Sequence, residues 1–126
     1  MELLGILGLW SLALGAVSGW LVTASVDKPE LLARVRVKHP GRLRQLHLDW
    51  VMMGLILIAV ELAVPSRPDW ITALIALGTI VNPRLFVPLA FSATASKELW
   101  YRAITAVSVR AMSVGLPALA AHATFA

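Results

Sequence analysis

The sequence contains no cysteine and few charged residues for its length. Charged side chains make up 14% of its 126 residues. The absence of cysteine excludes a disulfide framework and a thiolate metal site. The low share of charged residues argues against a soluble domain, in which about a quarter of the residues are charged. No internal repeat or low-complexity run is apparent either, so we expect a single domain.

Apolar residues are what the chain has in excess. They make up 59% of the sequence, and the mean hydropathy is +0.80. Four apolar stretches are each long enough to cross a hydrocarbon core of ~30 Å, which takes roughly 20 helical residues. We therefore predict an all-α, polytopic membrane protein, a bundle of four transmembrane helices in one domain covering residues 1–126. The expected spans are about 3–26, 46–64, 70–91 and 100–120.

The net charge of +4 arises mainly from one loop between the first two spans. Residues 27–46 carry six basic side chains against two acidic ones, a bias that marks the cytoplasmic side of a cell membrane. Both termini would then lie outside. Anionic lipid explains these charges more simply than nucleic acid does. The basic residues are Lys28, Arg34, Arg36, Lys38, Arg42 and Arg44.

Prolines and small residues predict the local features of the spans. Residues 31–37 could form a short amphipathic helix on the lipid surface. Pro83 lacks an N–H and frees the carbonyl of Thr79, so we expect a kink there. Gly15 and Gly19 form a pair of small residues four apart, which allows close helix packing, here expected between protomers.

A histidine and a carboxylate lie close together at the start of the second span. At about 100° per residue, His47, Trp50 and Gly54 share one face, and Asp49 points nearly the opposite way. Gly54 leaves a notch where a flat group could approach the backbone. Glu61 lies on the histidine face near the outer end. We interpret it as a carboxylate reaching external water or, in an electron-transfer protein, as part of a proton path.

Three charged residues fall in the inner half of their spans. They are Asp49, Arg84 and Arg110. Isolated charges at that depth are costly, so we expect Asp49 to pair with one of the two arginines. The pair would either hold the bundle together or leave the second arginine to neutralise an anionic ligand.

His47 is the one residue within the spans suited to ligating an iron centre, because cysteine is absent. A single axial histidine with an open sixth position suits haem. An interfacial histidine that binds no ligand is the alternative that the residues themselves leave open.

Three stretches resemble a family of small membrane enzymes. His47-Leu-Asp-Trp-Val-Met-Met-Gly54 resembles the His-Leu-Glu-Gly-Val-Met-Asn-Gly signature of the hydroxylaminobenzene mutases and, more loosely, the corresponding helix of styrene oxide isomerase. Gly15-Ala-Val-Ser-Gly-Trp20 resembles the Gly-x-x-Thr-Gly-Phe stretch of the mutases' first helix. Gly78-Thr-Ile-Val-Asn82 resembles their Gly-Thr-Tyr-x-Asn in helix three. The resemblance covers residues 5–92 and the four-span layout.

The resemblance implies an enzyme that rearranges its substrate without net redox change. Styrene oxide isomerases are trimers that hold haem b between subunits through one axial histidine, and their ferric iron acts as a Lewis acid on the epoxide oxygen. Carried across, His47 would ligate the iron, and Asn82 would be a catalytic polar group in or beside the pocket. Trp50 and Gly54 would line the haem. The residues expected to meet its propionates are Arg42, Arg44 and Arg84.

Two positions depart from the family pattern. The asparagine six residues after the histidine is Met53 here, and the tyrosine of helix three is Ile80. Both family residues are groups that would stabilise a substrate oxygen. One expectation is therefore a haem-dependent isomerase acting on a small, apolar, oxygenated substrate that arrives through the lipid. The other is a non-catalytic membrane protein, either a haem-bearing electron carrier or an accessory subunit of a larger complex.

Overall fold

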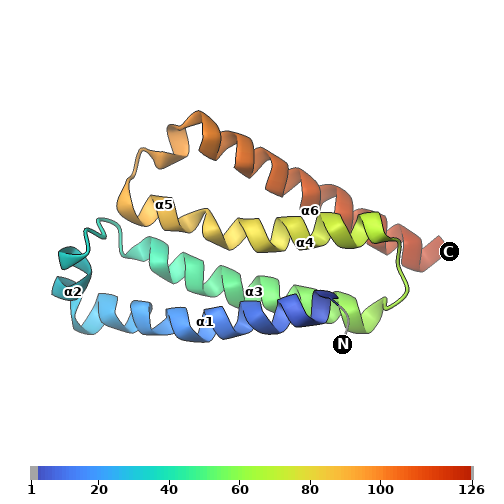
Figure 1. The fold of residues 1–126 in the computed structure, drawn as a ribbon, viewed down its shortest axis with the longest axis horizontal. Coiled ribbons are helices and arrows are strands. Elements are labelled where there is room, and N and C mark those ends of the chain that lie inside the picture. The colour runs from blue at the N-terminus through green and yellow to red at the C-terminus, as the bar shows by residue number, and fades with distance from the viewer. Residues whose placement is uncertain (1–2, 126) are drawn as a thin grey trace.

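Four long helices dominate the computed structural model, which describes residues 3–125 (Figure 1). All four are long and apolar enough to cross a membrane. No strand occurs within the described part of the chain, which confirms the predicted all-α, four-helix membrane architecture. The elements are α1 (Leu3–Asp27), α2 (Pro29–Arg34), α3 (Gly41–Ala63), α4 (Asp69–Arg84), α5 (Phe86–Phe91), the 3-10 helix η1 (Ala95–Lys97) and α6 (Leu99–Phe125).

Successive long helices run in opposite directions, so the connections gather at two ends (Figure 1). We call the end that holds residues 28–40 and 92–98 the basic end, and the end that holds residues 64–68 the turn end. α1 packs on α3, α3 on α4, and α4 on α6. Towards the basic end, α6 diverges from the other helices (Figure 1).

The second long helix begins earlier than predicted. α3 starts at Gly41 rather than near residue 46, with Pro40 as its N-cap residue. A proline is tolerated at a helix start because the first N–H groups have no intrahelical partner. Just before it, the backbone N–H groups of Lys38 and His39 both donate to the carbonyl of Ala90 in α5. These bonds fasten the loop to the bundle.

The closest helix pair is α1 with α3. A Cβ atom added to Gly54 would lie 2.9 Å from the carbonyl oxygen of Gly8, and one added to Gly8 would lie 2.9 Å from that of Gly54. A Cβ on Gly15 would come within 2.7 Å of the Val51 side chain. The expected notch at Gly54 is thus filled by α1. The glycines do serve close packing, but between two helices of one chain rather than between protomers.

Two prolines divide the third span. α4 ends at Arg84 and α5 begins at Phe86, with Leu85 between them. Pro83 cannot donate to the carbonyl four residues before it, and Pro88 cannot donate to that of Arg84. The predicted kink is therefore a complete interruption of the helix, at Leu85. The buried Tyr101 hydroxyl donates to the Leu85 carbonyl over 2.9 Å and joins α6 to the break.

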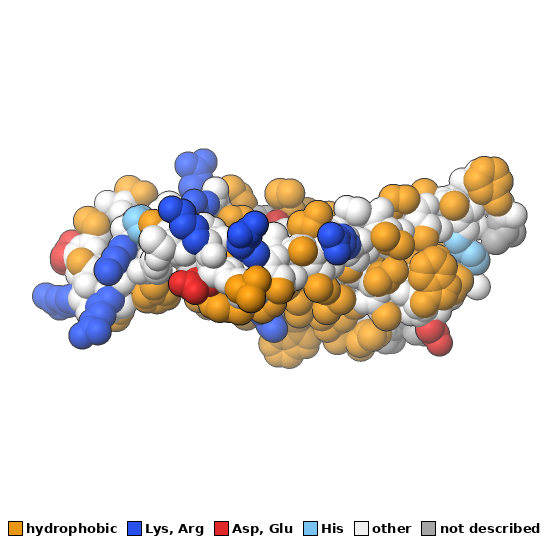
Figure 2. Space-filling view, turned by 90° about the horizontal axis from the view of Figure 1, so that it is seen from above, with side chains coloured by type: hydrophobic (Ala, Val, Ile, Leu, Met, Phe, Trp, Pro, Cys, Tyr) orange, Lys and Arg blue, Asp and Glu red, His pale blue; other side chains and the backbone are white. Residues whose placement is uncertain are grey.

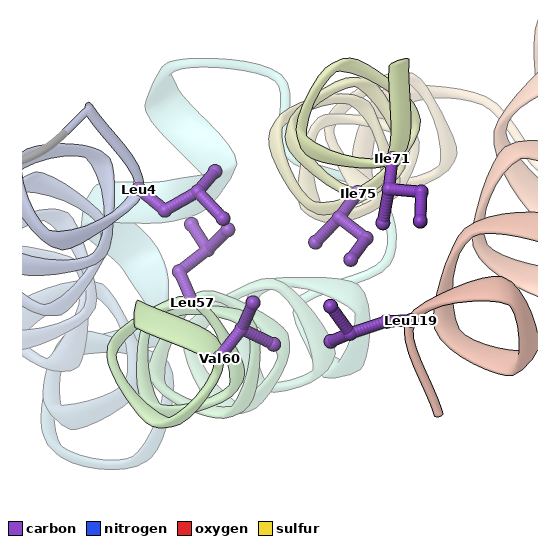
Figure 3. Close-up of a cluster of buried hydrophobic side chains, with 6 residues drawn as sticks. All are labelled: Leu4, Leu57, Val60, Ile71, Ile75 and Leu119. Carbon is purple, nitrogen blue, oxygen red and sulfur yellow. The ribbon is translucent and has the colours of Figure 1, made fainter. Parts of the chain in front are cut away.

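Apolar clusters hold both ends of the bundle together. The cluster at the turn end draws on all four long helices (Figure 3), and its members are Leu4, Leu57, Val60, Ile71, Ile75 and Leu119. The cluster at the basic end consists of Leu32, Leu43, Leu46 and Ala90. Because Leu32 belongs to it, α2 is anchored to the protein on one side, while Leu31 stays exposed. The helix does not cover the predicted residues 31–37, because Val35 is its C-cap residue and Arg36 has a positive φ of 64°.

Candidate functional site

His47 lies against α1, and one of its ring nitrogens is fixed by the backbone. Nδ1 is 2.6 Å from the carbonyl oxygen of Gly15. A carbonyl can only accept, so Nδ1 carries the proton, and in a neutral ring Nε2 holds the lone pair. The Ser18 hydroxyl lies 3.4 Å from the same nitrogen and also donates to the Gly15 carbonyl over 2.9 Å.

The seat of the imidazole is built from small residues. A Cβ on Gly19 would lie 3.3 Å from Cε1 of His47, so the ring rests on the backbone of α1. The Gly15-to-Trp20 stretch therefore supplies both the hydrogen-bond acceptor and the flat surface behind the ring. The sequence singled out both segments, but the bond between them joins residues 32 positions apart and has no local signal.

Asp49 pairs with an amide rather than with an arginine. The Asn82 Nδ2 group donates to Oδ2 of Asp49 over 3.0 Å. Within residues 3–125, the one ion pair is that of Glu61 with Arg67, so the expected pairing of Asp49 with Arg84 or Arg110 is wrong for the single chain. The short amide side chain of Asn82 reaches Asp49 because Asn82 faces α3 directly. Arg84 and Arg110 are exposed instead.

His47 and Asn82 do not meet within one chain. His47 contacts α1, whereas Asp49, two residues later, contacts Asn82 of α4. Two residues advance a helix by about 200°, so these contacts lie on nearly opposite sides of α3. The candidate iron ligand and the candidate catalytic amide thus belong to two separate polar sites.

A third feature brings together other predicted residues. Trp50, Ile80 and Arg84 line a cavity of about 100 Å³ between α1, α3 and α4. Ser11 of α1 adds a hydroxyl to its wall. His47 does not line this cavity, so Arg84 and Trp50 lie together but apart from the histidine seat.

The remaining predicted site residues are distributed along α3. Arg42 donates from Nη1 to Oε1 of Gln45 over 2.9 Å, and Arg44, one turn before His47, is exposed. Gly54 is buried under α1. Met53, which replaces a family asparagine, is buried in the bundle with 8% of its surface exposed.

An ion pair that was not predicted lies at the turn end. Nη2 of Arg67 lies 2.6 Å from Oε2 of Glu61, and both side chains are largely buried. Arg67 also donates to the Val64 carbonyl and to the Thr72 hydroxyl, each over 2.9 Å. Glu61 therefore does not reach into external water as expected. The sequence does contain an indication of this pair, because two opposite charges stand six residues apart on either side of a proline-rich turn.

No group of three or more histidine, cysteine or acidic side chains that could hold a metal occurs in residues 3–125. A metal bound only by protein side chains is therefore not indicated, whereas a macrocycle needs a single protein ligand. Neither a protein-family model, nor a curated protein, nor a solved structure matches this chain.

Proposed function

We propose that the protein is a membrane-embedded, haem-dependent isomerase in which His47 is the single axial ligand. The observation that supports this best is the hydrogen bond from Nδ1 of His47 to the Gly15 carbonyl. Histidines that ligate metals usually donate their other ring N–H to a carbonyl or carboxylate, which fixes the tautomer and raises the basicity of the ligating nitrogen. His47 has this arrangement with the Gly15 carbonyl.

The surroundings of His47 fit a haem in part. Its ring is half-buried, and Arg44 lies one turn away on the basic-end side, where it could meet a propionate by a charge-assisted bond. Arg42 is a second candidate for that contact. Bound ferric haem would supply a Lewis acid for the oxygen of a small apolar substrate such as an epoxide. The chain's own part is to hold the ligand nitrogen, anchor the propionates and exclude water.

In this proposal Asn82 has a positioning role. Its amide is engaged by Asp49 on the side of α3 away from His47, so it holds the α3–α4 seam. The apolar side chains of Met53 and Ile80 leave fewer polar groups for a substrate oxygen than the family pattern has. For that reason the second candidate is a non-catalytic haem protein that transfers electrons, or an accessory subunit.

The setting of the site belongs to the same proposal. The basic end would face the cytoplasm, because lysine and arginine are retained on that side of the cell membrane. Substrate would enter from the lipid. The family resemblance also implies a homotrimer, with the haem between copies.

The test is the absorption spectrum of protein produced with an ample haem supply. We expect a Soret band in the wild-type protein and its loss in His47→Ala, with helical circular dichroism retained. His39→Ala is the matched control, since it removes a histidine outside the long helices. A wild-type protein with no Soret band would exclude the haem proposal and favour the accessory subunit.

Activity then separates the two haem functions. Oxidised protein should convert an aryl epoxide to its carbonyl isomer, and reduced protein should not, because ferrous iron is the weaker Lewis acid. A haem-loaded protein that is inactive in both states would favour the electron carrier.

A further inference from the structure

Arg110 lies on a side of α6 that no other described part of the chain covers. It is exposed and is the twelfth of the 27 residues of the helix. Within residues 3–125 the one ion pair joins Glu61 to Arg67, so no described carboxylate neutralises Arg110. Charged side chains near the middle of a membrane helix normally face protein or water and pair with a counter-charge. This face of α6 therefore requires a partner.

The face is shaped for contact with another helix. Arg102, Ala106, Arg110 and Ser113 follow one another at spacings of four, four and three residues, so they share one side of α6. The small residues on either side of Arg110 let a second backbone approach closely. Figure 2, which looks onto the molecule from the side of α6, shows basic side chains spaced along this surface from the basic end towards its middle.

The level of Asp49 relative to α6 follows from two hydrogen bonds. Tyr101 of α6 donates to the carbonyl of Leu85, and Ser108 donates to that of Gly78. The two bonds thus match seven residues of α6 to seven residues of the antiparallel segment 78–85, which consists of the end of α4 and the interruption at Leu85. Position 105 of α6 must then be level with position 81 of α4, which directly precedes Asn82.

Asn82 in turn binds Asp49, so Asp49 is nearly level with position 105. Arg110 lies five residues further along α6, which is about 7.5 Å. Helical side chains lean towards the start of their own helix, and for α6 this direction leads back to the level of Asp49. An α6 helix at the same depth in a neighbouring molecule would therefore present Arg110 to Asp49.

We propose that α6 of one copy packs against α3 of a second copy, with Arg110 of the first bound to Asp49 of the second. Asp49 is half-buried and has one carboxylate oxygen, Oδ1, with no hydrogen-bond partner among the described residues. Exposed Leu48 and Met52 beside it provide an apolar surface for the arriving helix. Copies arranged around an axis along the membrane normal keep equal depth, as this contact needs.

This inference takes from the proposed function only the assumption that copies of the protein assemble with one another. What it adds is the contact that would hold the assembly together. Its experiments report mass and cross-linking, whereas the haem proposal is reported by the Soret band. Either proposal can therefore fail while the other holds.

Charge exchange tests the contact. We expect wild-type protein to be oligomeric by mass in mild detergent, and Arg110→Asp and Asp49→Arg each to be monomeric. Combining Arg110→Asp and Asp49→Arg in one chain should restore the oligomer, because every contact then again joins opposite charges, whatever the number of copies. Arg34→Asp, which alters an exposed arginine of α2, should leave the mass unchanged. A monomeric wild type, an oligomer that survives either single exchange, or failure of the double variant to assemble would overturn the proposal.

Cross-linking provides a second measurement that leaves the charges in place. The chain has no cysteine, so Ser113→Cys in one tagged copy and Met52→Cys in another provide an unambiguous pair. Both positions are exposed and lie three residues towards the turn end from Arg110 and Asp49. We expect a disulfide-linked dimer upon oxidation, and none with Val17→Cys in place of Met52→Cys. Equal cross-linking with the Val17→Cys copy, or no cross-linking with the Met52→Cys copy, would contradict the contact. Arg110 would then be covered by a lipid or by another, acidic membrane protein.

Discussion

The amide of Asn82 donates a hydrogen bond of 3.0 Å to the carboxylate of Asp49, and this bond joins α4 to α3 where an ion pair with arginine was expected. Removing the donor leaves a half-buried carboxylate with less stabilisation. We expect Asn82→Ala to lower the free energy of unfolding by about 1–3 kcal/mol, seen as a lower melting temperature in detergent.

The control is the same change in an Asp49→Ala background, where the amide has no carboxylate to bind. There, Asn82→Ala should cost less than in the wild type. Equal costs in both backgrounds would show that the two side chains do not interact in the folded protein.

Gly54 tests the contact between α1 and α3. A methyl group there would lie 2.9 Å from the Gly8 carbonyl oxygen, so the two helices must separate. Gly54→Ala should destabilise the protein by about 1–3 kcal/mol. Gly41→Ala is the matched control, because a Cβ at that position meets nothing within 4 Å. A Gly54→Ala protein as stable as Gly41→Ala would mean that the helices are not this close.

The ion pair at the turn end should contribute more than a surface pair. Arg67→Met leaves Glu61 buried without its counter-charge, and we expect a loss of about 3–5 kcal/mol. Adding Glu61→Leu to Arg67→Met should recover part of this loss. Thermal unfolding in detergent measures both variants. Asp69→Asn, an exposed position next to the turn, should be close to neutral, and a similar loss there would point to a general sensitivity of the turn instead.

Tyr101 tests the interruption between α4 and α5. Tyr101→Phe removes the hydroxyl that donates to the Leu85 carbonyl and keeps the aromatic ring. The expected loss is about 0.5–1.5 kcal/mol. Trp100→Phe, at an exposed neighbour, provides the comparison for melting temperature. If both changes cost the same, the hydroxyl does not stabilise the break.

Orientation in the membrane is tested most simply because the chain has no cysteine of its own. A cysteine introduced at Arg36 should react with a membrane-impermeant thiol reagent only after the cells are opened, since lysine- and arginine-rich loops remain in the cytoplasm. A cysteine at Ser66, in the opposite connection, should react from outside. Labelling of the Arg36 position in intact cells would reverse the proposed orientation.

The sequence was enough to predict the four long helices, but not the contacts that their polar side chains make with neighbouring helices. Apolar length and proline positions predict the four spans and the disturbance at Pro83, because these properties are local. The contacts of His47 with Gly15 and of Asp49 with Asn82 depend on how helices turn against each other, which one-dimensional spacing does not determine. The helical periodicity of about 100° per residue did place His47 and Asp49 on opposite sides of their helix. It could not show that α1 and α4 lie on those two sides.

The three hydrogen bonds of Arg67 also bear on how the chain enters a membrane. Arg67 is a cation at the end opposite the basic loop, where it would oppose the charge asymmetry that sets orientation. Its guanidinium is neutralised by Glu61 and bound to Val64 and Thr72, so the connection between α3 and α4 is closed and carries little net charge. If α3 and α4 pair before they enter the membrane, no isolated positive charge from this connection has to cross the hydrocarbon.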